Sequence, residues 1–163
     1  MSTIECAPIA FNVDFLDEPQ LAFANGLLHI DPKVGIPASG PWSRDDAHHP
    51  ASVGAGFIGT AETVEHARRW LARAAEGVDG DADHHPFCGY QADGPFRSTF
   101  RVDGPEAKIS ARDVRDLTAD RLKRIDGFNH LVDLIDNRLR HLAALDAPPT
   151  VVFLVLPDKL TKR

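Results

Sequence analysis

The segment PPTVVFLVLPDKLTKR, residues 148–163, constrains the fold more than any other part of the sequence. Its apolar run, VVFLVL, is rich in β-branched residues and lacks polar alternation, which is typical of a strand covered on both faces. Such strands occur in parallel sheets that carry helices on each side. We therefore expect an α/β fold in which this strand is parallel to its neighbours and central in the sheet.

Length and composition indicate a globular chain. At 163 residues the sequence has the size of one ordinary domain or part of one, and its 43% hydrophobic and 26% charged residues are near the globular average. No apolar run approaches the roughly 18 residues of a membrane span. The amino-terminal residues lack the basic start and apolar stretch of a secretion signal. We expect a cytoplasmic protein with no membrane partner, in which Cys6 and Cys88 are separate thiols.

The charge is unevenly distributed along the chain. The net charge of -6 argues against a surface that binds nucleic acid as a whole, because phosphate binding needs clustered Lys and Arg. Residues 1–60 hold seven acidic and two basic residues, whereas the final six residues, DKLTKR, hold three basic and one acidic. Any contact with nucleic acid is therefore expected to be local.

The first third of the chain predicts a hairpin and then an irregular connection. Apolar runs flank Asn25-Gly26 in residues 21–30, and this dipeptide favours a two-residue hairpin turn. Residues 31–52 are rich in proline, glycine and charge, which predicts an irregular surface connection. We assign residues 1–53 to this amino-terminal region and residues 54–163 to an α/β region.

The middle of the chain predicts a strand followed by an amphipathic helix. A short strand is expected around Phe57 and Ile58, Thr60 has the position of an N-cap, and Gly77 ends the helix. Apolar residues at helical spacing define the expected buried face of this helix: Val64, Ala67, Leu71 and Ala74.

The last third predicts a half-exposed strand at residues 96–103, a short helix after Ser110, and a long helix from Thr118 to about Leu145. The expected apolar face of the long helix comprises Leu122, Ile125, Leu131, Val132, Ile135, Leu139 and Leu142. Ligands bind beyond the carboxyl ends of strands in such sheets, so we expect the functional end at Leu156-Pro157-Asp158.

No motif in the sequence specifies catalysis, a cofactor or a metal. The histidine loops offer ligand types that zinc accepts, but their spacing does not place two ligands on one face. GAGFIGT lacks the order of a nucleotide fingerprint, and no nucleophile motif is present. The loop carboxylates and the charged helix residues are typical of solvated, ion-paired surfaces. The residues weighed in this way are His48, His49, His84, His85, Cys88, Asp31, Asp45, Asp46, Asp79, Asp81, Asp83, Arg121, Lys123, Arg124, Arg138 and Arg140.

Five segments, in order along residues 15–160, resemble the amino-terminal portion of a short prokaryotic Argonaute of the MID–PIWI type. No single segment is specific, but the ordered set is. The segments are EPQLAFANGLLHIDPKVGIPASGPW, AGFIGTAETVEHARRWLARA, HHPFCGY, HLVDLIDNRLRHL and PPTVVFLVLPDKL.

The resemblance implies a partial MID domain of Rossmann-like fold, which binds the 5′ end of a guide nucleic acid and, through the complete module, a target strand. Family members of this type lack a working slicer and act with an APAZ-containing partner that carries a sirtuin-like, TIR or nuclease effector. The resemblance therefore implies a protein without enzymatic activity of its own, in an assembly that defends bacteria against phages and plasmids.

The sequence departs from the family at its carboxyl end. The family's 5′-phosphate pocket uses a Tyr or His and Lys residues on the helix after the leucine-proline-acidic turn, and its PIWI domain follows later. Both are expected beyond Arg163, so the chain is interpreted as a fragment, a truncated product or a split subunit. The basic residues nearest to that place are Lys159, Lys162 and Arg163.

Two other hypotheses stay open at this point. The acidic first third favours an interaction subunit, in which residues 21–60 dock the effector without touching nucleic acid. The histidine loops leave room for a small metal-dependent α/β enzyme. Because the expected sheet is incomplete, we also expect low stability and an exposed apolar sheet edge.

Overall fold

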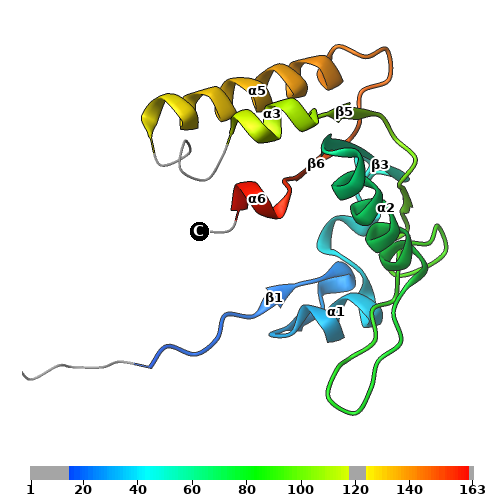
Figure 1. The fold of residues 1–163 in the computed structure, drawn as a ribbon. Coiled ribbons are helices and arrows are strands. Elements are labelled where there is room, and N and C mark those ends of the chain that lie inside the picture. The colour runs from blue at the N-terminus through cyan, green and yellow to red at the C-terminus, as the bar shows by residue number, and fades with distance from the viewer. Residues whose placement is uncertain (1–14, 118–123, 162–163) are drawn as a thin grey trace, which may run out of the picture.

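The computed structural model describes residues 15–117 and 124–161 (Figure 1). Strands and helices alternate through most of this range. In chain order they are β1 (Leu21–Ala22), the short 3-10 helix η1 (Ala24–Gly26), β2 (Leu28–His29), α1 (Pro32–Ser39), η2 (Trp42–Asp45), β3 (Ser52–Gly59), α2 (Ala61–Glu76), β4 (Thr99–Arg101), β5 (Glu106–Lys108), α3 (Ala111–Asp116), α5 (Ile125–Ala143), β6 (Val151–Val155) and α6 (Asp158–Thr161).

A four-stranded parallel sheet forms the body of the molecule, which confirms the α/β prediction. β4 and β5 follow one another along one edge of β3, opposite Ser52–Gly54 and Phe57–Gly59 respectively. β6 pairs with Ala55–Gly59 of β3, and because β5 faces the same stretch, β6 must lie on the other edge. β6 is therefore parallel, as predicted, but within residues 15–117 and 124–161 it pairs with a strand on one edge only, so the prediction that it is central is wrong for the described sheet. The central strand is β3.

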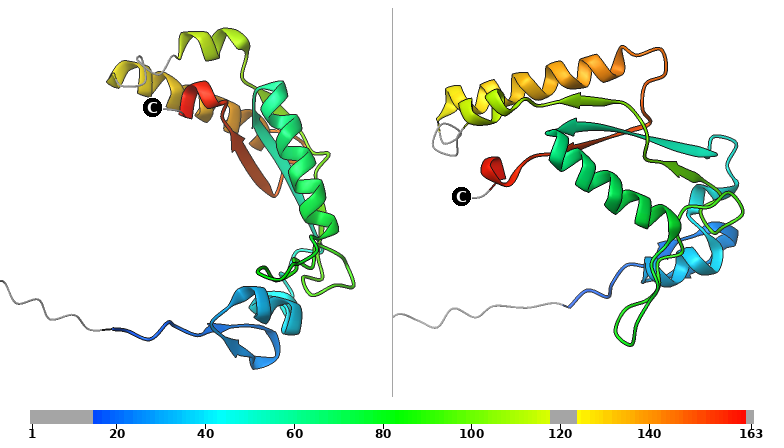
Figure 2. Two further views of the ribbon diagram at one scale, coloured as in Figure 1. Left: turned by 60° about the horizontal axis from the view of Figure 1, so that its bottom comes forward. Right: turned by 45° about the vertical axis from the view of Figure 1, so that its right-hand side comes forward.

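Helices cover both faces of this sheet (Figure 2). α2 lies on one face, where Phe57 and Ala55 of β3 pack against Val64 and Leu71. α3 and α5 lie on the other face. There the core comprises Ile58, Ala107, Ile109 and Leu142. The alternation of side chains along β3 thus supplies two separate cores from one strand.

The junction between β3 and α2 agrees with the sequence prediction. Thr60 caps the helix, accepting a hydrogen bond from the Thr63 backbone N–H at 3.3 Å, while its own backbone N–H donates to Thr63 Oγ1 at 3.0 Å. Gly77 ends the helix with φ of 104°, a conformation that favours glycine. All four predicted face residues of this helix are buried or half-buried.

The amino-terminal region confirms the hairpin and corrects the connection. β1 and β2 pair antiparallel, but Ala22 faces Leu28, so five residues including η1 join them instead of two. Residues 31–52 are not irregular throughout, because α1 and η2 lie within them. Asp31 caps α1 by accepting from the Lys33 backbone N–H at 2.8 Å, and Pro32 fits the first helical position. The division at residue 53 stays a prediction.

The last third also departs from the prediction. The strand expected at 96–103 is limited to β4, and β5 was not predicted, because its three residues, EAK, carry no strand pattern. Thr118 and Leu122 lie outside the described residues. α5 begins only at Ile125, since Arg124 is extended with ψ of 143°, and it ends at Ala143 rather than at Leu145.

The buried face of α5 differs from the predicted one as well. Leu131 and Leu142 are buried, but Ile125 is 74% exposed, Val132 46% and Leu139 41%. Leu134, Leu142 and Leu145 pack with the core on this face of the sheet, so the exposed apolar residues form a second, adjacent stripe. Within the described ranges, no helix is long and apolar enough to cross a membrane.

Candidate functional site

The chain reverses its direction across the sheet between β3 and β6. From β3 it passes over one face through α2 to β4 and β5, and from β5 it returns over the other face through α5 to β6. Parallel sheets bind ligands beyond the carboxyl ends of strands at such a switch point. The carboxyl ends concerned are Gly59 and Val155, which are register partners. This is the end at which the sequence placed Leu156-Pro157-Asp158.

Two hydrogen bonds connect the ends of β3 and β6 to neighbouring elements. Thr63 Oγ1 donates to the carbonyl of Val155 at 2.7 Å and so ties the first turn of α2 to the end of β6. The Ile109 backbone N–H donates to the carbonyl of Gly59 at 2.7 Å. A Cβ atom at Gly59 would lie 2.5 Å from the Val155 carbonyl oxygen, so only glycine fits there.

The first turn of α2 is poorly suited to an anion. The Thr63 backbone N–H is already bonded to Thr60, and Glu62 places a carboxylate in the same turn. A negative side chain satisfies the positive end of the helix dipole and repels a phosphate. The interpretation of GAGFIGT as a packed strand and helix start, not a phosphate loop, is consistent with this geometry.

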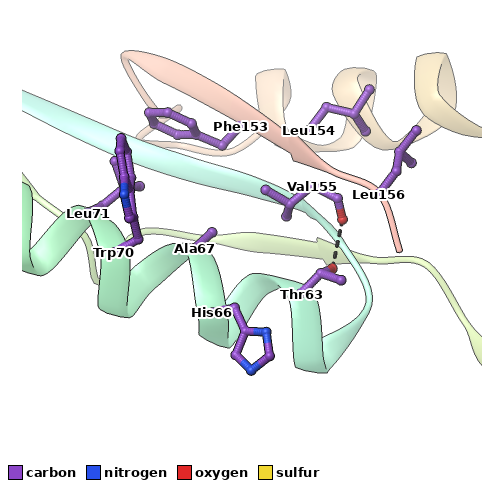
Figure 3. A pocket seen from close by; sticks show the side chains of 9 residues that line it. All are labelled: Thr63, His66, Ala67, Trp70, Leu71, Phe153, Leu154, Val155 and Leu156. Carbon is purple, nitrogen blue, oxygen red and sulfur yellow. Dashed lines mark hydrogen bonds between the residues drawn. The ribbon is translucent and has the colours of Figure 1, made fainter. Parts of the chain in front are cut away.

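An apolar groove lies between α2 and the outer edge of β6 (Figure 3). Its volume is about 660 Å³, and its polar side-chain groups are those of Thr63, His66 and the indole N–H of Trp70. Trp70 on α2 is 68% exposed and Leu154 on β6 is 45% exposed. Among the described residues no strand pairs with the outer edge of β6. The expected exposed apolar edge is thus present at β6.

Of the three basic residues predicted to be near nucleic acid, Lys159 lies in α6 and is exposed, directly beyond the carboxyl end of β6. The turn that carries it is closed by the Leu160 backbone N–H, which donates to the carbonyl of Pro157 at 2.9 Å. Lys162 and Arg163 lie outside the described residues.

Lys108 is a basic residue at the same end of the sheet that sequence reasoning missed. It is the last residue of β5 and ion-pairs with Glu106 at 2.7 Å. The Lys108 hydrogen bond is the main cause that lowers the pKa of Glu106, and the Arg68 guanidinium, 3.3 Å from the same carboxylate, acts in the same direction. If residues 106–108 had been predicted as a strand, Lys108 would have been placed at the carboxyl end of the sheet.

The histidine loops do not form a metal site in the part of the chain that the structure describes, where no three His, Cys, Asp or Glu residues could hold an ion together. His49 Nε2 lies 2.7 Å from the carbonyl of Phe96, and His84 Nδ1 lies 2.8 Å from Asp81 Oδ1. Burial raises the pKa of the Cys88 thiol, which disfavours the reactive thiolate. Cys6 lies outside the described residues.

The charged residues of the long helix form ion pairs where they are described. Arg140 Nε lies 2.7 Å from Asp136 Oδ2, and Arg124 Nε lies 3.5 Å from Asp126 Oδ1. Arg121 and Lys123 fall outside the described residues. The interpretation of this helix as an ion-paired surface is consistent with these contacts.

No protein-family model matches the sequence, and no curated protein matches it either.

Proposed function

We propose that this chain is the amino-terminal part of the MID–PIWI module of a short prokaryotic Argonaute, which contributes to guide-dependent nucleic-acid recognition and has no catalytic activity of its own. One observation supports the proposal above the others. The parallel sheet reverses its order between β3 and β6, and the Leu156-Pro157-Asp158 turn lies at that point, followed by the exposed Lys159. In the family this turn leads to the pocket for the 5′ phosphate of the guide.

The electrostatics favour a contact that is confined to this end of the sheet. The whole chain carries a net charge of -6, so non-specific binding over its surface is opposed by repulsion. Lys159 is exposed beyond β6, whereas Lys108 at the end of β5 is ion-paired with Glu106 and Glu62 occupies the neighbouring helix start. A phosphate would therefore approach from the β6 side, in the direction of α6.

Salt-dependent binding of a short single-stranded RNA with a 5′ phosphate tests the proposal. We expect measurable binding at about 50 mM salt that weakens about threefold per phosphate contact at about 200 mM, because each contact releases counterions. Replacement of one phosphate-contacting lysine lowers the salt slope by about one. Lys159→Gln should show this decrease, and binding should be monitored by fluorescence anisotropy.

Lys33→Gln is the matched control, because Lys33 is an exposed lysine on α1. It should bind RNA with the wild-type salt slope. The proposal is wrong if the chain binds no RNA at low salt, or if both variants change the slope equally. An RNA with a 5′ hydroxyl should bind more weakly than the phosphorylated one.

A second candidate function is supported by the surface of the amino-terminal hairpin. Four large apolar side chains of this region are exposed, namely Leu21, Leu28, Ile30 and Trp42, at 42%, 55%, 47% and 68%. Exposed apolar side chains in an acidic region suit a protein partner better than phosphate. In this alternative the hairpin docks an APAZ-containing effector, and neither the chain nor its hairpin contacts nucleic acid.

Co-purification with the effector distinguishes the two functions. The interaction function predicts that Lys159→Gln still retains the effector, while Leu28→Asp loses it. Retention of the effector by Leu28→Asp would exclude the hairpin as the docking surface.

A further inference from the structure

The tip of the amino-terminal hairpin carries the Asn25-Gly26 pair, which neither candidate function uses. Asn25 has φ of 58° and ψ of 19°, and Gly26 has φ of 73°, so both lie in the left-handed region. The Leu27 backbone N–H donates to the carbonyl of Ala24 at 3.3 Å. This geometry is that of a type I′ turn with Asn25 and Gly26 as its central residues. Both residues are exposed, so the pair is open to water.

An asparagine that precedes a glycine can react with its own main chain. The backbone nitrogen of the glycine attacks the side-chain carbon Cγ, a new C–N bond closes a succinimide ring, and the carboxamide nitrogen leaves with the displaced proton as ammonia. Water then adds to one of the two ring carbonyls and opens the ring to aspartate or isoaspartate. We propose that Asn25 is such a deamidation site, and that it reacts through a flip of the peptide plane that joins it to Gly26.

The surroundings of Gly26 leave the attacking nitrogen accessible. A Cβ atom added at Gly26 would have nothing within 4 Å, so no neighbouring group covers this residue. Within the described residues, the Gly26 N–H donates no hydrogen bond of ordinary length and angle. Glycine also lacks the side chain that hinders ring closure when another residue follows asparagine.

The type I′ turn itself holds the reacting atoms apart. Its ψ of 19° places the Gly26 nitrogen nearly eclipsed with the backbone nitrogen of Asn25, and so away from the Asn25 side chain. The Asn25 Nδ2 donates to Ser39 Oγ at 3.3 Å, and the Ser39 hydroxyl donates to the carbonyl of Ala24. Ser39 is only 6% exposed, so α1 fixes this acceptor in place. Both features slow the reaction.

A flip of one peptide plane brings the atoms together without unfolding the hairpin. In a type II′ turn, ψ of the first central residue is about −120° and φ of the second is about −80°. That ψ turns the Gly26 nitrogen to the side of Cβ, where the ring closes. Gly26 permits the flip because glycine adopts either sign of φ. The flipped conformation is disfavoured for Asn25, which has a side chain, so it is a minor form.

The products lose the contact between the hairpin and α1. A carboxylate at position 25 has no N–H to donate to Ser39, whose own hydrogen already goes to the Ala24 carbonyl. Isoaspartate also adds a methylene group to the main chain of the turn. Each reaction adds a negative charge and unties the tip of the hairpin from α1.

Mass spectrometry of the peptide that contains residue 25, after incubation of the native chain at mildly alkaline pH, tests the proposal. We expect the mass gain of an amide that becomes a carboxylic acid, at a lower rate than in the chain unfolded in urea. Asn129 and Asn137 are internal controls, because α5 holds them and a residue with a side chain follows each. They should stay unmodified in the native chain over the same period, and Asn25→Gln should abolish the change at position 25.

Ser39→Ala removes the acceptor for Asn25 Nδ2. It should raise the native rate about two- to tenfold, the effect of losing one ordinary hydrogen bond, and leave the rate in urea unchanged. The comparison of native and unfolded wild type needs no variant, so the proposal stays testable if Ser39→Ala does not fold.

The proposal is refuted if the native chain gains no mass at residue 25 while the unfolded chain does. Equal rates in the native and unfolded chains, or a folded Ser39→Ala that reacts at the wild-type rate, would refute the restraint by the turn. RNA binding is a separate readout, so its failure refutes only the proposed function.

Discussion

Truncation of Leu142 to alanine should destabilise the fold far more than truncation of Leu139, its neighbour on α5. Leu142 is 1% exposed and packs with Ile58, Ala107 and Ile109, whereas Leu139 is 41% exposed. Removal of a buried leucine side chain costs about 2–5 kcal/mol, because a cavity is left behind. Leu139→Ala loses a partly exposed contact and should cost about 1 kcal/mol.

The expected difference is large relative to the stability of a domain of this size, about 5–15 kcal/mol. The loss of about 2–5 kcal/mol for Leu142→Ala corresponds to a decrease in Tm of about 4–20 °C. Urea unfolding followed by circular dichroism, with thermal unfolding as a second measurement, gives both values. Alanine has good helix propensity, so α5 itself is not weakened by either change. Equal losses for the two variants would show that α5 packs by the face that periodicity predicts, and would refute the packing described above.

Two further predictions concern β3 and the α3 cap. Gly56→Ala places a Cβ atom 2.6 Å from Cγ of the rigid Pro149 ring, so it should lower the free energy of unfolding, measured with urea, by about 1–3 kcal/mol. Gly54→Ala is the control, because its Cβ atom meets only the movable end of the Arg101 side chain, 3.2 Å away, and it should cost less. A larger loss for Gly54→Ala than for Gly56→Ala would contradict the packing of Pro149 on the sheet. The Ser110 backbone N–H, 2.9 Å from Asp113 Oδ2, is the main cause that lowers the pKa of Asp113 below its ordinary 3.8. Its stabilising contribution is therefore complete well above pH 3.8 and is lost as pH falls through the folded pKa. The Tm of Asp113→Asn should decrease less than that of the wild type between about pH 5 and pH 2, and parallel curves would exclude this linkage.

The sequence predicted those parts of the fold that depend on neighbouring residues. Thr60 caps α2 and Gly77 ends it, because the N-cap and C-cap preferences act within one helical turn. The capped start of α3 at Ser110 was predicted on the same basis. Helix α1 was missed because its proline and glycine content suggested a loop, while the cap at Asp31 outweighed that composition.

The candidate site could be predicted only in part. Its location beyond β6 follows from the parallel sheet, and Lys159 lies there as expected. Lys108 was missed because β5 gains its strand conformation from pairing with Phe57–Gly59, not from its own three residues. The edge of β6 and its groove depend on residues of α2 that are distant in sequence, so no local pattern indicates them.

The sequence by itself determined that the chain folds as an α/β protein with a parallel last strand, because apolar periodicity reports which faces of an element are covered. Only the tertiary structure decided that β3 is central and that β6 has an open edge, within the described residues. The physical reason is that side chains point to the faces of a sheet, while strand order depends on backbone hydrogen bonds at its edges. Two strands with equally apolar side chains can therefore occupy the centre and the border of the same sheet.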